Sequence, residues 1–151
     1  MPVSRKNIRL SREIYETPSQ TFSITLCTWN RRRLFELDGH AKAVVSSLET
    51  GPFGNETERF AYCLMPDHLH LLVAPGNGNL VDLISAWKRF TGGCLKRAGL
   101  NGPFWQRGFY DHALRKEEDV RRVAEYIVHN PVRAGLTEHW KDYPYSWHRW
   151  M

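Results

Sequence analysis

The sequence predicts an α+β fold in which helices pack on one face of an antiparallel sheet. The spacing of apolar residues gives the order strand, helix, two strands, helix, strand, helix along the chain. The two central strands are separated only by Pro66-Asp67, and so short a connection joins antiparallel neighbours in a hairpin. A length of 151 residues suits one layered domain.

The first strand and the first helix follow from two different periods. Apolar residues at every second position from Gln20 to Leu26 predict a strand. Asp38 is then expected to cap a helix, because apolar residues recur at helical spacing from Ala41 to Leu48. Gly51-Pro52 ends this helix.

The central hairpin carries two histidines. Phe60 to Met65 predicts its first strand, and Pro66-Asp67 marks the turn. In the second strand, leucine and valine alternate with His68 and His70. Residues two apart on a strand point to the same face, so both imidazoles are expected on one side of the sheet.

The second half of the chain predicts helix, strand and helix. Leu80 to Lys96 has helical spacing, and Phe104 to Leu114 has the character of a strand. The acidic run Glu117-Glu118-Asp119 favours the N-terminus of a last helix. That helix is expected to end near Asn130, because Pro131 disfavours helical geometry in the residue before it.

Composition and charge limit the function classes. The net charge of +5 suggests an anionic partner, most commonly nucleic acid. The three cysteines include no CxxC pair, and an odd number argues against a disulfide framework, so we expect reduced thiols and a cytoplasmic location. No apolar run approaches the roughly 20 residues that a membrane span needs, so no membrane partner is expected.

The histidine pair predicts a divalent-metal site. His68 and His70 can both bind one ion from a single strand face. The alternative is a pair of surface histidines on the open face of a half-exposed sheet. Two nitrogen ligands with open positions suit Zn²⁺, or Mn²⁺ and Mg²⁺ with help from oxygen ligands. A third ligand is required, and an amide or carboxylate oxygen would favour the harder ions.

The last predicted helix offers a nucleophile. Tyr126 falls about 110° from the centre of the apolar face, at its edge, and Asn130 lies on the same side of the helix. The alternative is a boundary tyrosine and an asparagine that caps the helix. A phenol can act as a covalent nucleophile, and a divalent ion can polarise a phosphate. His68, His70 and Asn130 could then bind the ion, about one helical turn from Tyr126.

These residues resemble a known family, the Y1 transposases of the IS200/IS605 type, and most closely the REP-associated tyrosine transposases. The resemblance covers roughly residues 20 to 150, and its two C-terminal motifs are the specific ones. Four segments carry it: Met65–Val73, Trp87–Phe90, Phe104–His112 and Tyr126–Leu136.

The resemblance implies a ferredoxin-like fold and a metal-dependent single-stranded DNA endonuclease and transposase. Tyr126 would attack a phosphodiester to give a 5′-phosphotyrosine and a free 3′-OH, and the enzyme would cleave and rejoin hairpin DNA of repetitive extragenic palindromes (REP). His68 and His70 match the metal ligands of the family's HUH motif. Asn130 matches a further ligand, which is Gln in the insertion-sequence branch. Mg²⁺ or Mn²⁺ is the expected cofactor, and the protein is expected to be a monomer or a homodimer.

The composition of the two ends of the chain, together with the resemblance, divides it into three parts. Residues 20–136 would form the catalytic domain, after a basic lead-in over residues 1–19 and before an aromatic tail over residues 137–151 that packs on or extends the same domain. Basic residues of the chain are expected to contact DNA phosphates. They are Arg31, Arg32, Arg33, Lys88, Arg89, Arg107, Arg115 and Arg133. His112 is expected to support the site or contact DNA, and Tyr110 is the rival nucleophile.

Two other functions stay open at this point. A histidine-triad nucleotide hydrolase also uses alternating histidines, but Leu72 occupies the position of the third one. A hairpin-binding protein that has lost catalysis or has been domesticated would keep the DNA contacts alone.

Overall fold

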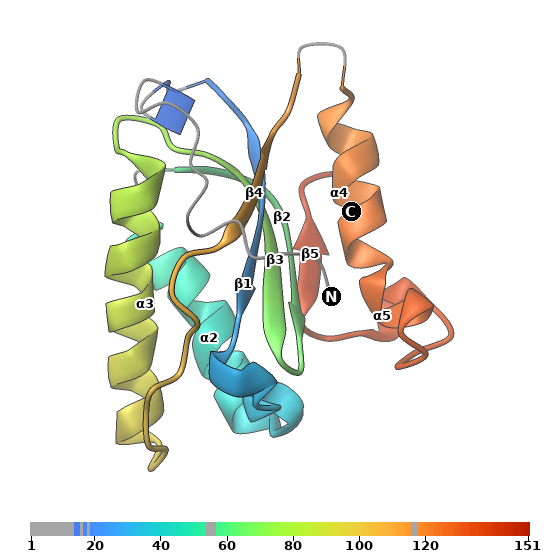
Figure 1. Cartoon of the computed structure of the whole chain (residues 1–151). Helices are drawn as coiled ribbons and strands as arrows, with labels where there is room; N and C mark the ends of the chain where they lie inside the picture. Colours follow the sequence, from blue (N-terminus) through green and yellow to red (C-terminus); the bar gives the residue numbers. More distant parts are fainter. Residues whose placement is uncertain (1–13, 16, 18, 54–56, 116–117) are drawn as a thin grey trace.

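An antiparallel sheet of five strands, in the order β4-β1-β3-β2-β5, forms the centre of the computed structural model (Figure 1). The structure describes residues 14–15, 17, 19–53, 57–115 and 118–151. Its strands are β1 (Phe22–Cys27), β2 (Glu58–Met65), β3 (His68–Ala74), β4 (Tyr110–Ala113) and β5 (Ser146–His148). Its helices are α2 (Asp38–Thr50), α3 (Leu80–Arg97), α4 (Val120–Val128) and α5 (Asn130–Arg133), with 3-10 turns η1 (Trp29–Arg31), η2 (Leu34–Glu36) and η3 (Trp140–Asp142).

The connections give the ferredoxin-like arrangement. Helix α2 joins β1 to β2, α3 joins β3 to β4, and the strands between them form the order 4-1-3-2. The α+β class and the antiparallel sheet predicted from the sequence are therefore confirmed. Strand β5, from the aromatic tail, is added beside β2 at the edge of the sheet.

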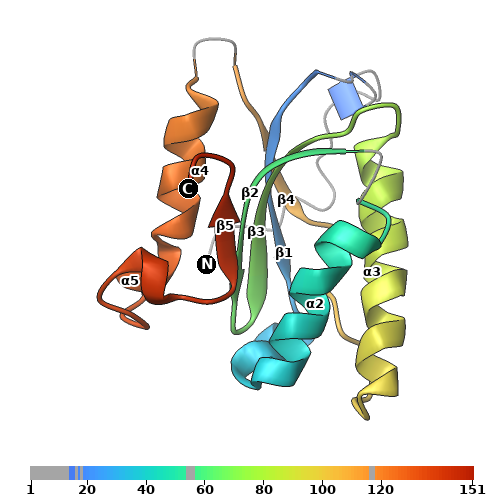
Figure 2. The same ribbon diagram turned by 180° about the vertical axis from the view of Figure 1, so that it is seen from behind.

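Helices cover both faces of the sheet, whereas the sequence predicted one. Helices α2 and α3 pack on one face, as expected, but α4 lies on the other (Figures 1 and 2). The reason lies in β2 and β3, which are apolar on both sides. Leu69 points into the layer of α2 and α3, whereas Cys63 and Leu72 pack against Ala124 and Ile127 of α4.

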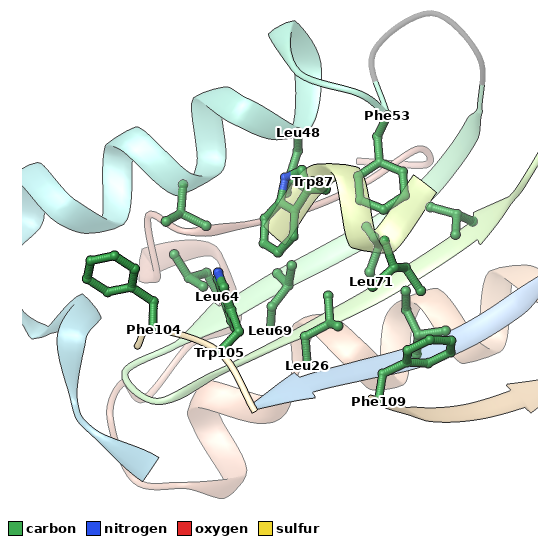
Figure 3. Packing of buried hydrophobic residues seen from close by; sticks show 14 of the residues in the cluster. Leu26, Leu48, Phe53, Leu64, Leu69, Leu71, Trp87, Phe104, Trp105 and Phe109 are labelled. Carbon is green, nitrogen blue, oxygen red and sulfur yellow. The ribbon is translucent and has the colours of Figure 1, made fainter. Parts of the chain in front are cut away.

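Trp87 fixes the layer formed by α2 and α3. Its ring is fully buried between Leu48 and the strands (Figure 3). Its indole nitrogen donates to Ser47 Oγ at 2.9 Å, so the buried N–H has a partner. Trp105 packs beside it, with ring centroids 5.1 Å apart, and donates to Thr91 Oγ1 at 3.0 Å. These bonds position α3 and the chain after it on the sheet.

The predicted hairpin is present, and its register places the histidines. Met65 is paired with His68 across the turn, so His68 is the first residue of β3. On the other side β1 runs antiparallel to β3, with Cys27 opposite His68 and Thr25 opposite His70.

The fourth strand is shorter than predicted. Only Tyr110–Ala113 pairs with β1, and Trp105 forms an isolated bridge with Thr28. The interruption has a local cause. Gly108 has a left-handed backbone, with φ 70°, and its carbonyl accepts from Lys88 Nζ at 2.7 Å instead of joining a strand.

The last helix is also shorter than predicted. Asp119 caps it by accepting from the backbone N–H of Arg121 at 2.9 Å, and α4 starts at Val120. Glu117 lies outside the described residues. Helix α4 ends at Val128, and Asn130 opens the separate short helix α5 because Pro131, in its first turn, has no N–H to continue the ladder.

Most of the expected lead-in over residues 1–19 lies outside the described residues. Within it Tyr15 is buried, and its hydroxyl donates to Asp111 Oδ2 at 2.6 Å. Among the described residues, no helix is both long and apolar enough to cross a bilayer.

Candidate active site

Strand β3 presents both histidines on the face of the sheet that α4 covers. Leu69 and Leu71 belong to the core under α2 and α3, so the residues that alternate with them point the other way. The Nε2 atoms of His68 and His70 are 3.1 Å apart, and the two rings meet edge to face.

Each histidine is held on its other nitrogen. His68 Nδ1 lies 2.7 Å from Asp67 Oδ1, and His70 Nδ1 lies 3.1 Å from Thr25 Oγ1 on β1. An ionised carboxylate only accepts hydrogen bonds, so neutral His68 carries its hydrogen on Nδ1 and a lone pair on Nε2. The Thr25 hydroxyl can accept from His70 in the same way.

This arrangement fits a divalent ion. With both hydrogens on Nδ1, two Nε2 lone pairs face one another across 3.1 Å. Two nitrogens at that separation can both lie about 2.0–2.1 Å from one ion, the usual distance for a metal bound by histidine. Among the described residues no three His, Cys, Asp or Glu side chains cluster as a ligand set, so other ligands would have to complete the coordination.

Burial keeps both rings neutral. It lowers the pKa of His68, although the Asp67 carboxylate opposes the shift. It lowers the pKa of His70 to about 3, and the neighbouring His68 and the charges of Arg133 and Arg31 act in the same direction. A neutral imidazole is the form that binds metal, so neither ring would have to lose a proton to bind an ion at neutral pH.

Arg31 completes a network beside His68. Its Nε donates to Asp67 Oδ2 at 3.0 Å, and its Nη2 lies 3.5 Å from His68 Nδ1. Burial alone would raise the pKa of Asp67, but the hydrogen bonds from Arg31 and His68 outweigh it and lower that pKa. Of the three consecutive arginines at positions 31–33, Arg31 is therefore the one that contacts the residues around the histidine pair.

The backbone of Arg31 adopts a rare conformation. Asn30 and Arg31 have φ of 54° and 53°, in the left-handed region that arginine seldom occupies. Thr28 stabilises the turn, since its hydroxyl bonds the carbonyls of Arg32 at 2.7 Å and Asp67 at 3.0 Å. Local strain of this kind is common where a side chain must be aimed at a functional site.

Tyr126 lies on the solvent side of α4. Its side chain is 65% exposed, whereas Ala124 and Ile127 form the buried stripe. The guanidinium carbon of Arg133 lies 3.7 Å from the centroid of the Tyr126 ring. The carboxyl end of α4, the helix α5 and the β2–β3 turn all lie at one end of the molecule (Figures 1 and 2).

Arg133 contacts Tyr126, and its charge acts on His70. It covers the Tyr126 ring, donates to the Tyr126 carbonyl at 2.7 Å, and contributes to the low pKa of His70. The sequence offered Arg133 as a phosphate contact only. Arg133 lies seven residues after Tyr126, and this spacing did not predict that the two side chains would be in contact. The contact arises because the chain breaks between α4 and α5.

Asn130 is bonded on both ends of its amide. Its Nδ2 donates to the Ile127 carbonyl at 2.8 Å, and its Oδ1 accepts from Arg133 Nη2 at 2.9 Å. An amide oxygen has a second lone pair, so this contact is compatible with metal ligation. Ligation by Asn130 stays a prediction.

Several other predicted residues serve the fold or lie apart from the histidines. Arg32 Nη1 donates to the carbonyls of Asn101 at 2.9 Å and Pro103 at 3.1 Å, and Arg33 pairs with Glu36 at 2.9 Å. Lys88 Nζ bonds two carbonyls of the 106–108 segment. Arg89 and Arg107 are exposed.

His112 shares the sheet face of the histidine pair but not its site. It lies on β4, two strands from β3, and its Nε2 is 3.0 Å from Glu118 Oε1. Arg115 lies 3.6 Å from the same Glu118 oxygen. These contacts stabilise the segment before α4.

Tyr110 and Thr25 lie on the same face of the sheet as His70, but only Tyr110 was singled out from the sequence. Tyr110, the rival nucleophile, is paired with Thr25 and so shares its face of the sheet. The role of Thr25 was missed. It is a polar residue that alternates with buried Ile24 and Leu26, which marks it as facing away from that core but names no partner.

Comparison with known proteins agrees with this geometry. The family described as "Transposase IS200 like" matches residues 17–130, a range that contains both histidines, Tyr126 and Asn130. A Haemophilus influenzae protein assigned to the REP-associated tyrosine transposases is 34% identical over 101 residues, which cover 59% of this chain and 57% of that protein. A REP-associated tyrosine transposase of Escherichia coli is 35% identical over 90 residues, 57% of this chain and 51% of that protein.

The chain thus spans about half the length of the curated relatives it matches. A solved structure of a REP-associated tyrosine transposase bound to a REP hairpin superposes with a TM-score of 0.70 and 23% identity, covering 91% of this chain and 81% of that one. That likeness establishes the shared fold. With a family match over most of its length, this chain belongs to the IS200-like transposases.

Proposed function

We propose that this protein is a metal-dependent endonuclease and strand transferase that cleaves and rejoins single-stranded DNA beside a hairpin. The histidine pair carries the proposal: two Nε2 atoms 3.1 Å apart, each ring held at Nδ1, on the sheet face that the tyrosine helix covers. The relatives are REP-associated transposases, so a REP-type hairpin is the proposed substrate.

Tyr126 is the proposed nucleophile. Its oxygen attacks the scissile phosphorus, a Tyr–O–P bond forms, and the bond from phosphorus to the 3′-oxygen breaks. The phenol proton passes to solvent, which the exposure of Tyr126 allows, and the leaving 3′-oxygen takes up a proton. Attack by a 3′-OH on the phosphotyrosine reverses these steps and rejoins the strand.

The residues around the nucleophile position it and hold the cofactor. His68 and His70 would bind Mg²⁺ or Mn²⁺, with Asn130 Oδ1 as the proposed oxygen ligand. When bound, the ion would polarise the scissile phosphate and offset the charge that develops on it. Arg133 restricts the ring of Tyr126, which limits the directions from which the phenol oxygen can approach a phosphate. DNA as substrate and three free thiols fit a cytoplasmic protein.

The test is a covalent adduct with a defined polarity. A hairpin oligonucleotide with a single-stranded flank is labelled at either its 5′ or its 3′ end and incubated with protein and Mn²⁺, Mg²⁺ or EDTA. The 3′-end label should remain on the protein after denaturing electrophoresis, because a 5′-phosphotyrosine retains the downstream fragment. The 5′-end label should be released on a shorter strand, and EDTA should abolish both products.

Tyr110 supplies the matched control. Tyr126→Phe should form no adduct, whereas Tyr110→Phe should still form one, since each change removes a single hydroxyl. An adduct formed by Tyr126→Phe, or one that retains the 5′-end label, would overturn the proposal. If the wild type binds the hairpin but does not cleave it, the protein is a hairpin-binding protein that has lost catalysis, and the proposal is wrong.

A further inference from the structure

A groove of about 660 Å³ lies between the second half of α3 and residues 102–104. Its volume falls in the ~300–1,000 Å³ range of small-molecule sites. Arg89, Gly92, Gly93 and Lys96 line it from α3, and Phe104 lines it from the facing loop. The groove is separate from the histidine pair, because α3 and α4 cover opposite faces of the sheet (Figure 1).

Two glycines form the floor of the groove, and the fold does not require them. Glycine disfavours a helix relative to alanine, and here two adjoin inside an 18-residue helix. Neither Gly92 nor Gly93 has a left-handed φ. A Cβ on Gly92 would meet Phe104 at 3.6 Å, and one on Gly93 would meet the Arg97 side chain at 3.5 Å, both ordinary contacts. The absence of side chains therefore points to space kept for something that approaches the helix closely.

The groove is cationic at both ends. Arg89, Gly92, Gly93 and Lys96 recur at three- and four-residue intervals, so they share one face of α3. Arg89 and Lys96 are exposed, lie about 10 Å apart along the helix axis, and form no ion pair with a carboxylate of the described residues. Charge complementarity calls for an anionic occupant with more than one negative group.

One short segment links this groove to the histidine pair. The backbone N–H of Trp29 donates to the Phe104 carbonyl at 2.8 Å, on the wall of the groove. Two residues later, Arg31 contacts Asp67 and His68. Trp29 itself is 39% exposed, and it is linked to both places only through this backbone segment, with its N–H on the groove wall. The β2–β3 turn and the second half of α3 also lie in the same half of the molecule (Figures 1 and 2).

We propose that the groove binds the sugar–phosphate backbone of the single-stranded flank of the DNA that the active site cleaves. Arg89 and Lys96 bind phosphates, the glycine floor lets the backbone approach the helix, and Trp29 offers a ring on which a base can stack. This assignment rests on the proposed function for its ligand. The groove would be a second DNA-binding site, on the face of the sheet opposite the histidine pair.

The test compares binding of two oligonucleotides, a hairpin alone and the same hairpin with a long single-stranded flank. Affinities are measured by fluorescence anisotropy in EDTA over a range of salt, so that cleavage plays no part. The double variant Arg89→Ala with Lys96→Ala should weaken binding of the flanked oligonucleotide by about tenfold. It should also lower the salt slope by about 1.4, or about 0.7 for each phosphate that the variant no longer neutralises. Binding of the bare hairpin should be unchanged.

Two further variants make the test specific. Lys42→Ala with Lys141→Ala removes two exposed cations outside the groove and should leave both affinities unchanged. Gly93→Leu fills the floor without changing charge and should weaken only the flanked oligonucleotide. Equal affinity of wild type and Arg89→Ala with Lys96→Ala for the flanked oligonucleotide would overturn the proposal, as would an equal loss in the Lys42 and Lys141 control. The proposed function fails separately, if wild type forms no adduct with Mn²⁺ or Mg²⁺.

Discussion

The Nε2 atom of His68 lies 3.1 Å from the Nε2 atom of His70, and each ring has a hydrogen-bond partner at its other nitrogen, Nδ1. Asp67 bonds one Nδ1 and Thr25 bonds the other. Partners of this kind fix the tautomer and the direction of a histidine ligand. A strand alone would bring the two rings to one face. With both hydrogens on Nδ1, these partners would also direct the two Nε2 lone pairs toward one point.

Mn²⁺ or Mg²⁺ should stabilise the folded protein through this pair. An ion that binds only the native state at a hundred times its dissociation constant adds about 2.7 kcal/mol to the free energy of unfolding. A thermal melt of the wild type should therefore shift upward with metal, and His68→Ala should remove the shift. His112→Ala is the control, since His112 is exposed and bonded to Glu118. An undiminished shift in His68→Ala would place the metal elsewhere.

Thr25 should matter for metal affinity without being a ligand. Thr25→Val keeps the shape of the side chain and removes the oxygen 3.1 Å from His70 Nδ1. Loss of such a partner typically lowers metal affinity about 10–100-fold. Thr25→Ser restores the hydroxyl and should restore affinity, as measured by calorimetric titration with Mn²⁺. Equal affinity of the valine and serine variants would contradict a positioning role.

Acid should destabilise the metal-free protein through the buried histidines. Burial holds the pKa of His70 at about 3 and lowers that of His68, whereas in the unfolded chain both titrate near 6.5. Below that pH the unfolded state binds more protons, so stability is full above about pH 6.5 and falls as pH falls toward 3. Over this range His70 should contribute about 1.4 kcal/mol to the free energy of unfolding per pH unit, and His68 contributes in the same direction.

Urea unfolding in EDTA at several values between about pH 4 and pH 7 measures this slope. His148 is a further buried histidine with a lowered pKa and adds to the slope. His70→Gln should therefore flatten the dependence without abolishing it. A slope that is the same in wild type and in this variant would show that His70 is not buried as a neutral ring.

The sequence predicted the elements whose signals are local. The alternation in β3 and the Pro66-Asp67 turn predicted the hairpin and the shared face of both histidines, which the register confirms. The side of the sheet that α4 covers could not be predicted in this way. The apolar residues of β2 serve both faces, and only tertiary packing decides which helix takes which face.

The partners of the histidines were harder to predict because they depend on pairing between distant segments. Thr25 lies 45 residues before His70 and meets it only through the register of β1 and β3. Arg31 reaches Asp67 because two successive residues, Asn30 and Arg31, adopt a left-handed backbone. The identities of these two residues do not predict that conformation. The contact of Arg133 with Tyr126 depends in the same way on where α4 ends.

Ser47 should contribute to stability as the buried acceptor for the Trp87 indole, while its own hydroxyl hydrogen goes to the Val44 carbonyl. Its hydroxyl accepts from the Trp87 indole at 2.9 Å, and both side chains are buried. Ser47→Ala leaves that N–H without an acceptor and should lower the free energy of unfolding by about 1–3 kcal/mol. The adjacent exposed Ser46→Ala should change it by no more than about 0.5 kcal/mol. Equal stabilities in urea would show that the indole finds another partner.

Arg133 should act on the rate of cleavage more than on DNA affinity. Its guanidinium holds the Tyr126 ring, the Tyr126 carbonyl and Asn130 Oδ1 together, and misplacement of a reacting group can cost about a hundredfold in rate. Arg133→Lys keeps the charge but loses the planar fork, so it should cleave almost as slowly as Arg133→Ala while binding DNA like the wild type. Single-turnover adduct formation at saturating oligonucleotide separates the two effects. Full rescue of the rate by lysine would show instead that Arg133 serves as a phosphate contact, the role that its charge alone suggests.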